Sequence, residues 1–259
     1  MQTQQDSRIN NSALPNNRIF LPASAGFGLA VLAAMLGSLS GFGTRWGWWS
    51  FMGGFTILKW SALMGLAAAA LSLAGGIVTR PGTVRRGFAL SVAGLVIGLV
   101  VAGVPLSWIL KAQELPRIHD ITTDTDDPPR FIAILALRKD TPNSAEYEGR
   151  KVASQQLSAY PDIRPLTLAV PQARAFDRAL ATAKRMGWTI VDANAREGRI
   201  EATDTTFWFG FTDDVVIRIR EAPGGSRVDV RSESRVGLSD IGANAARIRS
   251  FLRDLEKKG

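Results

Sequence analysis

Two stretches near the C-terminus hold the residues of this sequence whose types and spacing could do chemistry. In residues 213–221 and 227–235, arginines and carboxylates alternate with valine and isoleucine, which is the pattern of strands with one apolar face. The other face would then carry a lattice of guanidinium and carboxylate groups. This lattice could consist of cross-strand ion pairs on a solvated surface. Alternatively, its arginines could hold an anionic group or a partner's acidic surface, because guanidinium pairs bidentately with carboxylate and phosphate.

Few residues could support catalysis. His119 is the single histidine, so a Ser-His-Asp arrangement would have to take its base from there. Asp213 and Asp214 are a candidate acid–base pair, but neighbouring strand residues face opposite sides and converge only at a bulge. The sequence has no cysteine, which excludes thiol catalysis, thiolate metal sites and disulfides. The sequence therefore favours a protein that is not an enzyme, and leaves open a hydrolase or a metal-dependent enzyme.

An acidic stretch that contains three prolines, residues 111–130, is expected to be a linker. Its side chains could offer ligands to Ca²⁺ or Mg²⁺, but they lack the glycine-containing spacing of an EF-hand. We expect no cofactor and no metal ion. The weak candidates for metal ligands are His119, Asp120, Asp124, Asp126 and Asp127.

Three apolar segments, residues 20–43, 60–79 and 87–110, precede this stretch. About 20 apolar residues in a helix span the roughly 30 Å of hydrocarbon in a bilayer, so we expect three transmembrane helices. No ionisable residue lies within these segments, which argues against a transporter or a pump. The aromatic stretch 46–58 is expected to lie along the membrane interface. Small residues recur at four-residue spacing, which either permits close helix packing or reflects ordinary membrane-helix composition.

Basic residues predict the orientation of these helices. The turn between the second and third segments carries Arg80, Arg85 and Arg86, and short loops rich in Lys and Arg stay cytoplasmic. Residues 1–19 would then be a cytoplasmic tail, and everything after residue 110 would be periplasmic, with the protein in the inner membrane. Residues 1–110 carry a charge of +6 and residues 111–259 only +2. The basicity therefore belongs mainly to the membrane flanks, which makes nucleic acid a poor partner.

Residues 131–259 are expected to form an α+β domain. Residues 131–137 form a short strand or a helical turn, and residues 166–170 form a strand. One helix follows Pro171, four strands occupy residues 188–235, and a last helix begins at Ser239 with Asp240 in its first turn. We expect an antiparallel sheet with both helices packed on one face. The aromatic cluster of Phe207, Trp208, Phe209 and Phe211 is either ordinary core or the rim of an apolar cavity between the sheet and the last helix.

Two sequence blocks, DTTFWFGFTDDVVIRIR at residues 204–220 and VDVRSESRVGLSDIGANAARI at residues 228–248, resemble the domain of unknown function 1499 family. The resemblance covers about residues 115–256 and leaves the three apolar segments outside. It implies a domain without implying a mechanism, because the family has no established activity. The shared polar positions, which we take as binding candidates, are Asp213, Asp214, Arg218, Arg231, Ser232, Ser234, Arg235, Asp240, Asn244 and Arg247.

Together these observations predict a protein anchored in the inner membrane that presents a periplasmic binding domain. The expected partners are the lipid bilayer and either an anionic or lipid-like envelope ligand or an envelope protein. The alternative is a structural protein, in which the helices assemble with other membrane proteins and the domain serves as an interaction platform.

Overall fold

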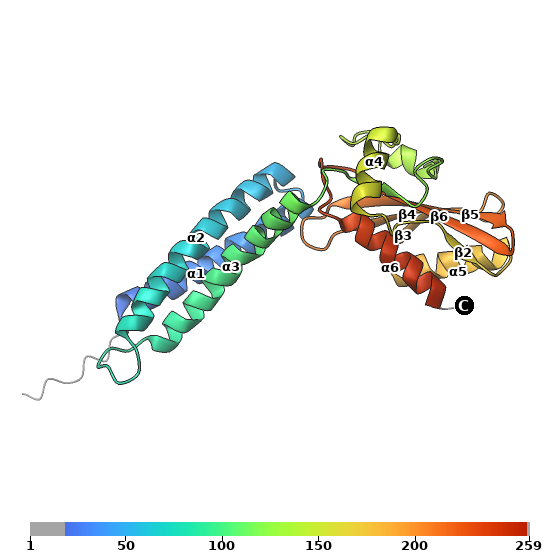
Figure 1. The fold of residues 1–259 in the computed structure, drawn as a ribbon. Helices are drawn as coiled ribbons and strands as arrows, with labels where there is room; N and C mark the ends of the chain where they lie inside the picture. The colour runs from blue at the N-terminus through green and yellow to red at the C-terminus, as the bar shows by residue number, and fades with distance from the viewer. Residues whose placement is uncertain (1–18, 258–259) are drawn as a thin grey trace, which may run out of the picture. The chain divides into compact units, whose positions relative to one another are not determined.

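The computed structural model describes residues 19–257 and divides into two compact units (Figure 1). Residues up to 43 together with 49–106 form the first unit, and residues 44–48 together with those from 107 onward form the second. The expected cytoplasmic tail lies almost wholly outside the described residues.

The first unit is built from three helices that are long and apolar enough to cross a membrane, as the sequence predicted. They are α1 (Leu21–Arg45), α2 (Phe51–Val78) and α3 (Phe88–Glu114). Helix α2 begins nine residues before the predicted segment, because Ser50 caps it by accepting a hydrogen bond from the backbone N–H of Gly53. The prediction that residues 51–58 lie outside the second helix is therefore wrong. Lys59 lies within α2, where a long side chain can extend its ammonium towards water.

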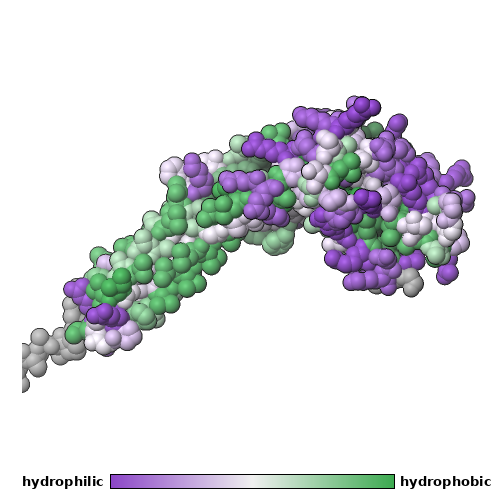
Figure 2. Space-filling model, in the orientation of Figure 1, coloured by the Kyte–Doolittle hydropathy of each residue, from purple (hydrophilic) through white to green (hydrophobic). Residues whose placement is uncertain are grey.

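Small residues let the three helices approach closely. A Cβ atom built on Gly65 would lie 2.9 Å from the carbonyl oxygen of Gly98, and the hydroxyl of Ser61 on α2 donates to the carbonyl of Ala33 on α1 at 2.7 Å. The four-residue spacing of small side chains thus serves packing within the unit. Large aliphatic side chains such as Leu66 and Leu99 lie on its exposed surface, and Figure 2 shows hydrophobic residues over most of its visible face.

The second unit contains an antiparallel sheet, as predicted, and the sheet has six strands. Strands β3 (Thr189–Asn194), β4 (Arg199–Thr205), β5 (Thr212–Ala222) and β6 (Gly225–Ser234) correspond to the four strands predicted in residues 188–235. The spatial order is β1-β6-β5-β4-β3, and β2 also pairs with β6. The remaining strands are β1 (Asp120–Thr122) and β2 (Leu166–Leu168), of which β2 lies in the segment predicted as a strand.

Strand β1 lies inside the stretch that the sequence assigned to a linker. Asp120, Ile121 and Thr122 pair with β6, and Ile118 and Ile121 are buried in the main core. The sheet therefore begins about ten residues before the predicted start of the domain. Three residues are too few for their alternation to be recognised in a sequence.

Helices α5 (Gln172–Arg185) and α6 (Ala243–Lys257) pack on the same face of the sheet, as predicted (Figure 1). Helix α6 begins four residues later than expected, because Ile241 and Gly242 have φ of 52° and 79°, which a right-handed helix does not allow. The Asp240 carboxylate instead accepts hydrogen bonds from the backbone N–H groups of Gly242 and Asn244, both at 2.8 Å. Asp240 thus caps the N-terminus of α6 from a position before the helix begins.

The opposite face of the sheet is covered by residues 124–149, which we call the strap. It contains the short 3-10 helix η1 (Ala133–Leu137) and leads into helix α4 (Arg150–Ala159), which no sequence pattern predicted. Phe131 and Ile134 of the strap pack on Val216 of β5 in a second, smaller core. The alternative in which the charged face is a solvated surface is therefore wrong for its centre.

Candidate functional site

The fold divides the ten candidate residues between the two faces of the sheet. Asp213 and Asp214 point to opposite faces, as the alternation predicted, and the pairing of β5 with β6 continues without a register shift at these positions. Asp240 lies in the loop before α6. On the α6 side lie Asp213, Ser232, Ser234, Asn244 and Arg247, and on the strap side lie Asp214, Arg218, Arg231 and Arg235.

The group on the α6 side is a closed hydrogen-bond network around Arg247. Its guanidinium donates to Asp213 Oδ2 at 2.6 Å and to Asp204 Oδ2 at 2.8 Å. It also donates to Asn244 Oδ1 at 2.6 Å and to Ser232 Oγ at 3.0 Å. Asn244 in turn donates to Ser234 Oγ and to the carbonyl of His119. Because these buried groups satisfy one another, we interpret this network as an attachment of α6 to the sheet.

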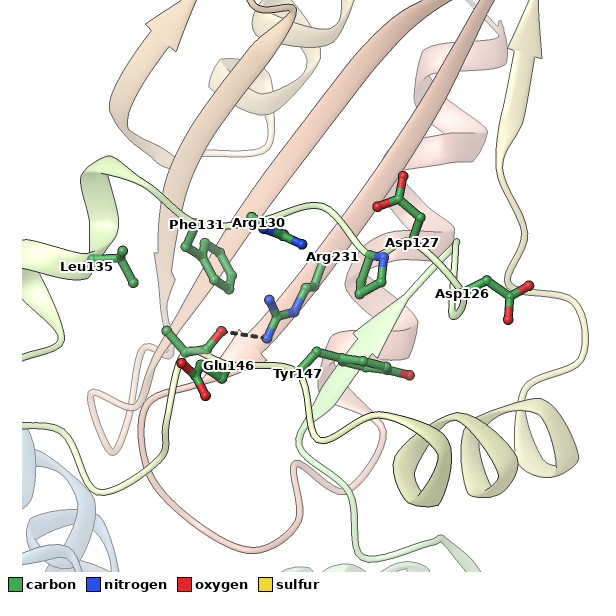
Figure 3. A pocket seen from close by; sticks show the side chains of 10 residues that line it. Asp126, Asp127, Arg130, Phe131, Leu135, Glu146, Tyr147 and Arg231 are labelled. Atoms are coloured by element: carbon green, nitrogen blue, oxygen red, sulfur yellow. Dashed lines mark hydrogen bonds between the residues drawn. The ribbon is translucent and has the colours of Figure 1, made fainter.

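The group on the strap side has Arg231 at its centre. Its Nε and Nη2 donate to the two carboxylate oxygens of Asp120 on β1 at 2.9 and 2.8 Å. Nη2 also donates to the carbonyl of Ala145 at 2.9 Å, and the guanidinium carbon lies 4.8 Å from the ring centre of Phe131 and 5.6 Å from that of Tyr147. Figure 3 shows Arg231 between these two rings. A guanidinium stacked on aromatic faces and paired bidentately is held in one orientation.

Glu233 lies between Arg231 and Arg138, an arginine of the strap. One carboxylate oxygen lies 3.3 Å from Arg231 Nη2 and the other 3.2 Å from Arg138 Nη2. Burial, followed by the nearby charge of Asp120, raises the pKa of Glu233 to about 8. Burial also raises the pKa of Asp120, and the Arg231 guanidinium opposes that effect.

Asp214 completes this cluster. It is fully buried and accepts hydrogen bonds from Arg138 Nη1 at 2.7 Å and from Arg235 Nη2 at 2.8 Å. Three carboxylates and three guanidinium groups thus lie together beneath the strap. Removal of one partner of such a pair strongly destabilises the fold, because it leaves a buried charge without compensation.

A second set of arginines lies further along the same face, where it is partly open to solvent. Asp229 is buried and accepts hydrogen bonds from Arg218, Arg220 and Arg227. Asp124 and Asp127 of the strap pair with the same arginines. These pairs fasten the start of the strap to the sheet.

A cavity of about 510 Å³ opens above Arg231, between two parts of the strap. Besides the Arg231 guanidinium, its lining includes the rings of Phe131 and Tyr147 and several charged groups (Figure 3). Burial raises the pKa of Tyr147, which further keeps this phenol neutral. The remaining lining residues are Asp126, Asp127, Pro128, Arg130, Leu135, Ala145 and Glu146.

The aromatic cluster of the β4–β5 loop does not border this cavity. Phe209 is buried and stacks on Phe211 with ring centres 5.4 Å apart, whereas Phe207 is 78% exposed. The space between the sheet and α6, where one of the two alternatives placed an apolar cavity, is filled by core side chains such as Ile217, Val230 and Ile248.

The weak candidates for metal ligands are not brought together. Asp120 is bound by Arg231, and Asp124 accepts from Arg227 and from backbone N–H groups of the strap. Within residues 19–257, no group of three or more His, Asp or Glu side chains is arranged to hold a metal ion.

Sequence reasoning missed the residues that the strap contributes to the site, namely Phe131, Arg138, Asn143 and Tyr147. The strap has no repeated apolar spacing beyond one helical turn, so its path depends on contacts with the sheet. A weak signal was available, because the apolar segment 131–137 is followed directly by Arg138. Such a segment could pack one side on the sheet and pair its arginine with a carboxylate there.

Comparison with known proteins adds the family and no activity. No curated protein matches this chain. The profile of one family, described as "Protein of unknown function (DUF1499)", matches residues 120–255, which is more than half of the chain. The match begins at strand β1, ends within α6 and includes the strap. The chain therefore belongs to the DUF1499 family of proteins of unknown function.

Proposed function

We propose that this protein is a binding module anchored in the bacterial inner membrane, whose cavity above Arg231 takes a polar ligand of the cell envelope. The proposal rests on one observation, a buried arginine that lines a cavity. The side chain is 2% exposed, yet it lines a cavity large enough for a small ligand.

Arg231 retains donor capacity at Nη1. Nε and Nη2 are occupied by Asp120 and Ala145. Among the described residues, Nη1 has one hydrogen-bond partner, the carbonyl of Pro129 at 3.4 Å. Because Nη1 carries two N–H groups, a ligand oxygen could accept the second one. An arginine already fixed by other contacts loses little entropy when it binds a ligand.

The charges of the lining favour a polar ligand over a simple anion. The charge of Arg231 is compensated by Asp120, and that of Asp127 by Arg218 and Arg220. The remaining charged lining groups are Asp126, Glu146 and Arg130. With two carboxylates against one guanidinium, an oxygen-rich ligand such as a sugar or a peptide group fits better than a free phosphate.

We also propose that the second unit lies on the periplasmic side of the membrane. The arginines of the turn between α2 and α3 favour a cytoplasmic position for that turn, and three crossings then deliver the second unit to the periplasm. A domain held there meets lipids, glycans and envelope proteins, which include the proposed ligands.

The cavity can be tested with a matched pair of variants on η1. Leu135 and Leu137 are 48% and 50% exposed, but only Leu135 lines the cavity. Leu135→Trp would fill the cavity without touching an ion pair, and Leu137→Trp controls for the added indole. The full-length chain, gently extracted from its own membrane, would be measured by native mass spectrometry.

We expect the wild type and Leu137→Trp to retain a small molecule of defined mass, and Leu135→Trp to lose it. A bare wild-type chain, or the same bound mass in both variants, would overturn the cavity as the ligand site. A second polypeptide in place of a small molecule would support the interaction platform.

A further inference from the structure

Several side chains of the sheet fasten the strap. The Glu201 carboxylate accepts hydrogen bonds from the backbone N–H groups of Ile132, Ala133 and Ile134 at 2.8–3.1 Å. The Asn143 amide of the strap donates to the carbonyl of Ser234 at the end of β6 and to that of Gly237 in the following loop, both at 2.9 Å. The Arg231 guanidinium reaches the carbonyl groups of Pro129 and Ala145 on both sides of the cavity.

The cluster of Asp120, Asp214 and Glu233 differs from these attachments because the strap covers it. Arg138 of the strap bridges Asp214 and Glu233, so lifting the strap would remove Arg138 and admit water to both carboxylates. The groups that face Glu233 are Asp120 from β1, Asp214 from β5, Arg231 from β6 and Arg138 from the strap; His119 and Tyr147 lie near Asp120.

We propose that the strap is proton-linked: its release from the sheet is coupled to the loss of a proton from the buried carboxylate cluster around Glu233. In the closed state two neighbouring carboxylates and burial disfavour a further negative charge on Glu233. In the released state water solvates that charge. Rising pH therefore favours release, and the strap provides both sides of the cavity, so release also opens the cavity. This last consequence rests on the proposed function, whereas the coupling itself does not.

The pH range of the coupling follows from the protonation of Glu233. With the strap closed, the pKa of Glu233 is about 8, and the ordinary value is 4.5. Between these values the closed state holds a proton that the released state does not. The equilibrium constant for release then rises by up to tenfold per pH unit and levels off above pH 8.

Amide hydrogen exchange of the full-length chain between pH 5.5 and 9 measures this release. Each rate is divided by the intrinsic rate at that pH to give a protection factor, so that the ordinary pH dependence of exchange cancels. We expect protection of residues 128–147 to fall by up to tenfold per pH unit until about pH 8. Peptides from α6, on the other face of the sheet, report global unfolding of the second unit, so release of the strap alone requires lower protection in residues 128–147 than in α6 at each pH.

Two variants separate proton coupling from simple weakening of the strap. We expect Glu233→Gln to remove the pH dependence, because glutamine has no proton to lose. Glu201→Gln removes an attachment outside the cluster, so it should lower protection at every pH and leave the slope unchanged. A flat wild-type profile, or an unchanged slope in Glu233→Gln, would overturn the proposal. The wild-type profile tests the coupling even if a variant does not fold. It requires no ligand, so its outcome is independent of the binding proposal.

Discussion

At the scale of single residues, two buried arginines of the second unit have different surroundings. Arg247 on α6 donates one or two hydrogen bonds from each guanidinium nitrogen, and its acceptors are four side chains. Arg231 on β6 is at least as deeply buried, but it lines a cavity, and its Nη1 makes one long hydrogen bond, to the carbonyl of Pro129. The adjoining cavity, which Arg247 does not line, is what makes Arg231 the binding candidate of the two.

Arg247→Leu should strongly destabilise the second unit. The substitution leaves Asp213 buried without its partner at 2.6 Å, and breaking a buried pair in this way costs about 3–5 kcal/mol. Arg249→Leu on the same helix is the control, because Arg249 and its partner Asp162 are both exposed, and an exposed pair contributes less than about 1 kcal/mol. Chemical denaturation of the two variants checks this. Equal losses would contradict the structural role of Arg247.

Glu233 gives the second unit a characteristic pH dependence. Its pKa is about 8 in the folded protein and ordinarily 4.5, so between these values the folded chain holds a proton that the unfolded chain releases. The free energy of unfolding should therefore fall as pH rises through this range, by up to about 1.4 kcal/mol per unit. Denaturation at several pH values measures the slope, and Glu233→Gln should flatten it. A variant with the wild-type slope would assign the effect to another group.

At the scale of elements, residue patterns made five strands and two helices predictable. The alternation in 213–221 and 227–235 also placed Asp213 and Asp214 on opposite faces. The strap was not predictable, because its position depends on contacts such as Glu201 with η1 and Arg138 with Asp214, which join residues about 70 positions apart. Because these contacts cannot be recognised in the sequence, a solvated surface remained one of the two alternatives for the charged face.

Helix packing in the first unit offers a test with two neighbouring glycines of α3. A Cβ atom on Gly98 would lie 2.9 Å from the backbone nitrogen of Ala69, whereas none of the described atoms lies within 4 Å of a Cβ on Gly103. Gly98→Ala should therefore force α2 and α3 apart and cost about 1–3 kcal/mol, while Gly103→Ala should be neutral or stabilising. Unfolding in detergent compares them. Similar stabilities would show that close contact at Gly98 is unimportant.

At the scale of the whole molecule, the charge distribution predicts the orientation. Residues 1–110 hold most of the net charge, and the turn between α2 and α3 is its densest part. We expect alkaline phosphatase fused after Lys111 to be active, because the enzyme matures only outside the cytoplasm, and a fusion within the turn at residues 80–86 to be inactive. The reverse pattern would place the second unit in the cytoplasm and exclude envelope ligands.

The two units differ in their surfaces and in the extent of the family match. The three helices use their small residues for packing among themselves and present aliphatic side chains outward, as expected of an anchor in lipid. The family match covers the other unit alone. The activity of the protein should therefore be sought in the second unit, and the cavity above Arg231 is its most specific feature.

Photo-crosslinking in intact cells tests this central claim most directly. A photoreactive amino acid would replace Leu135, which lines the cavity, or Leu137, which lies on the same short helix and does not. We expect the purified chain to carry a covalent adduct of one defined mass after irradiation at position 135 and not at position 137. No adduct at either position, or the same adduct at both, would contradict a ligand site above Arg231.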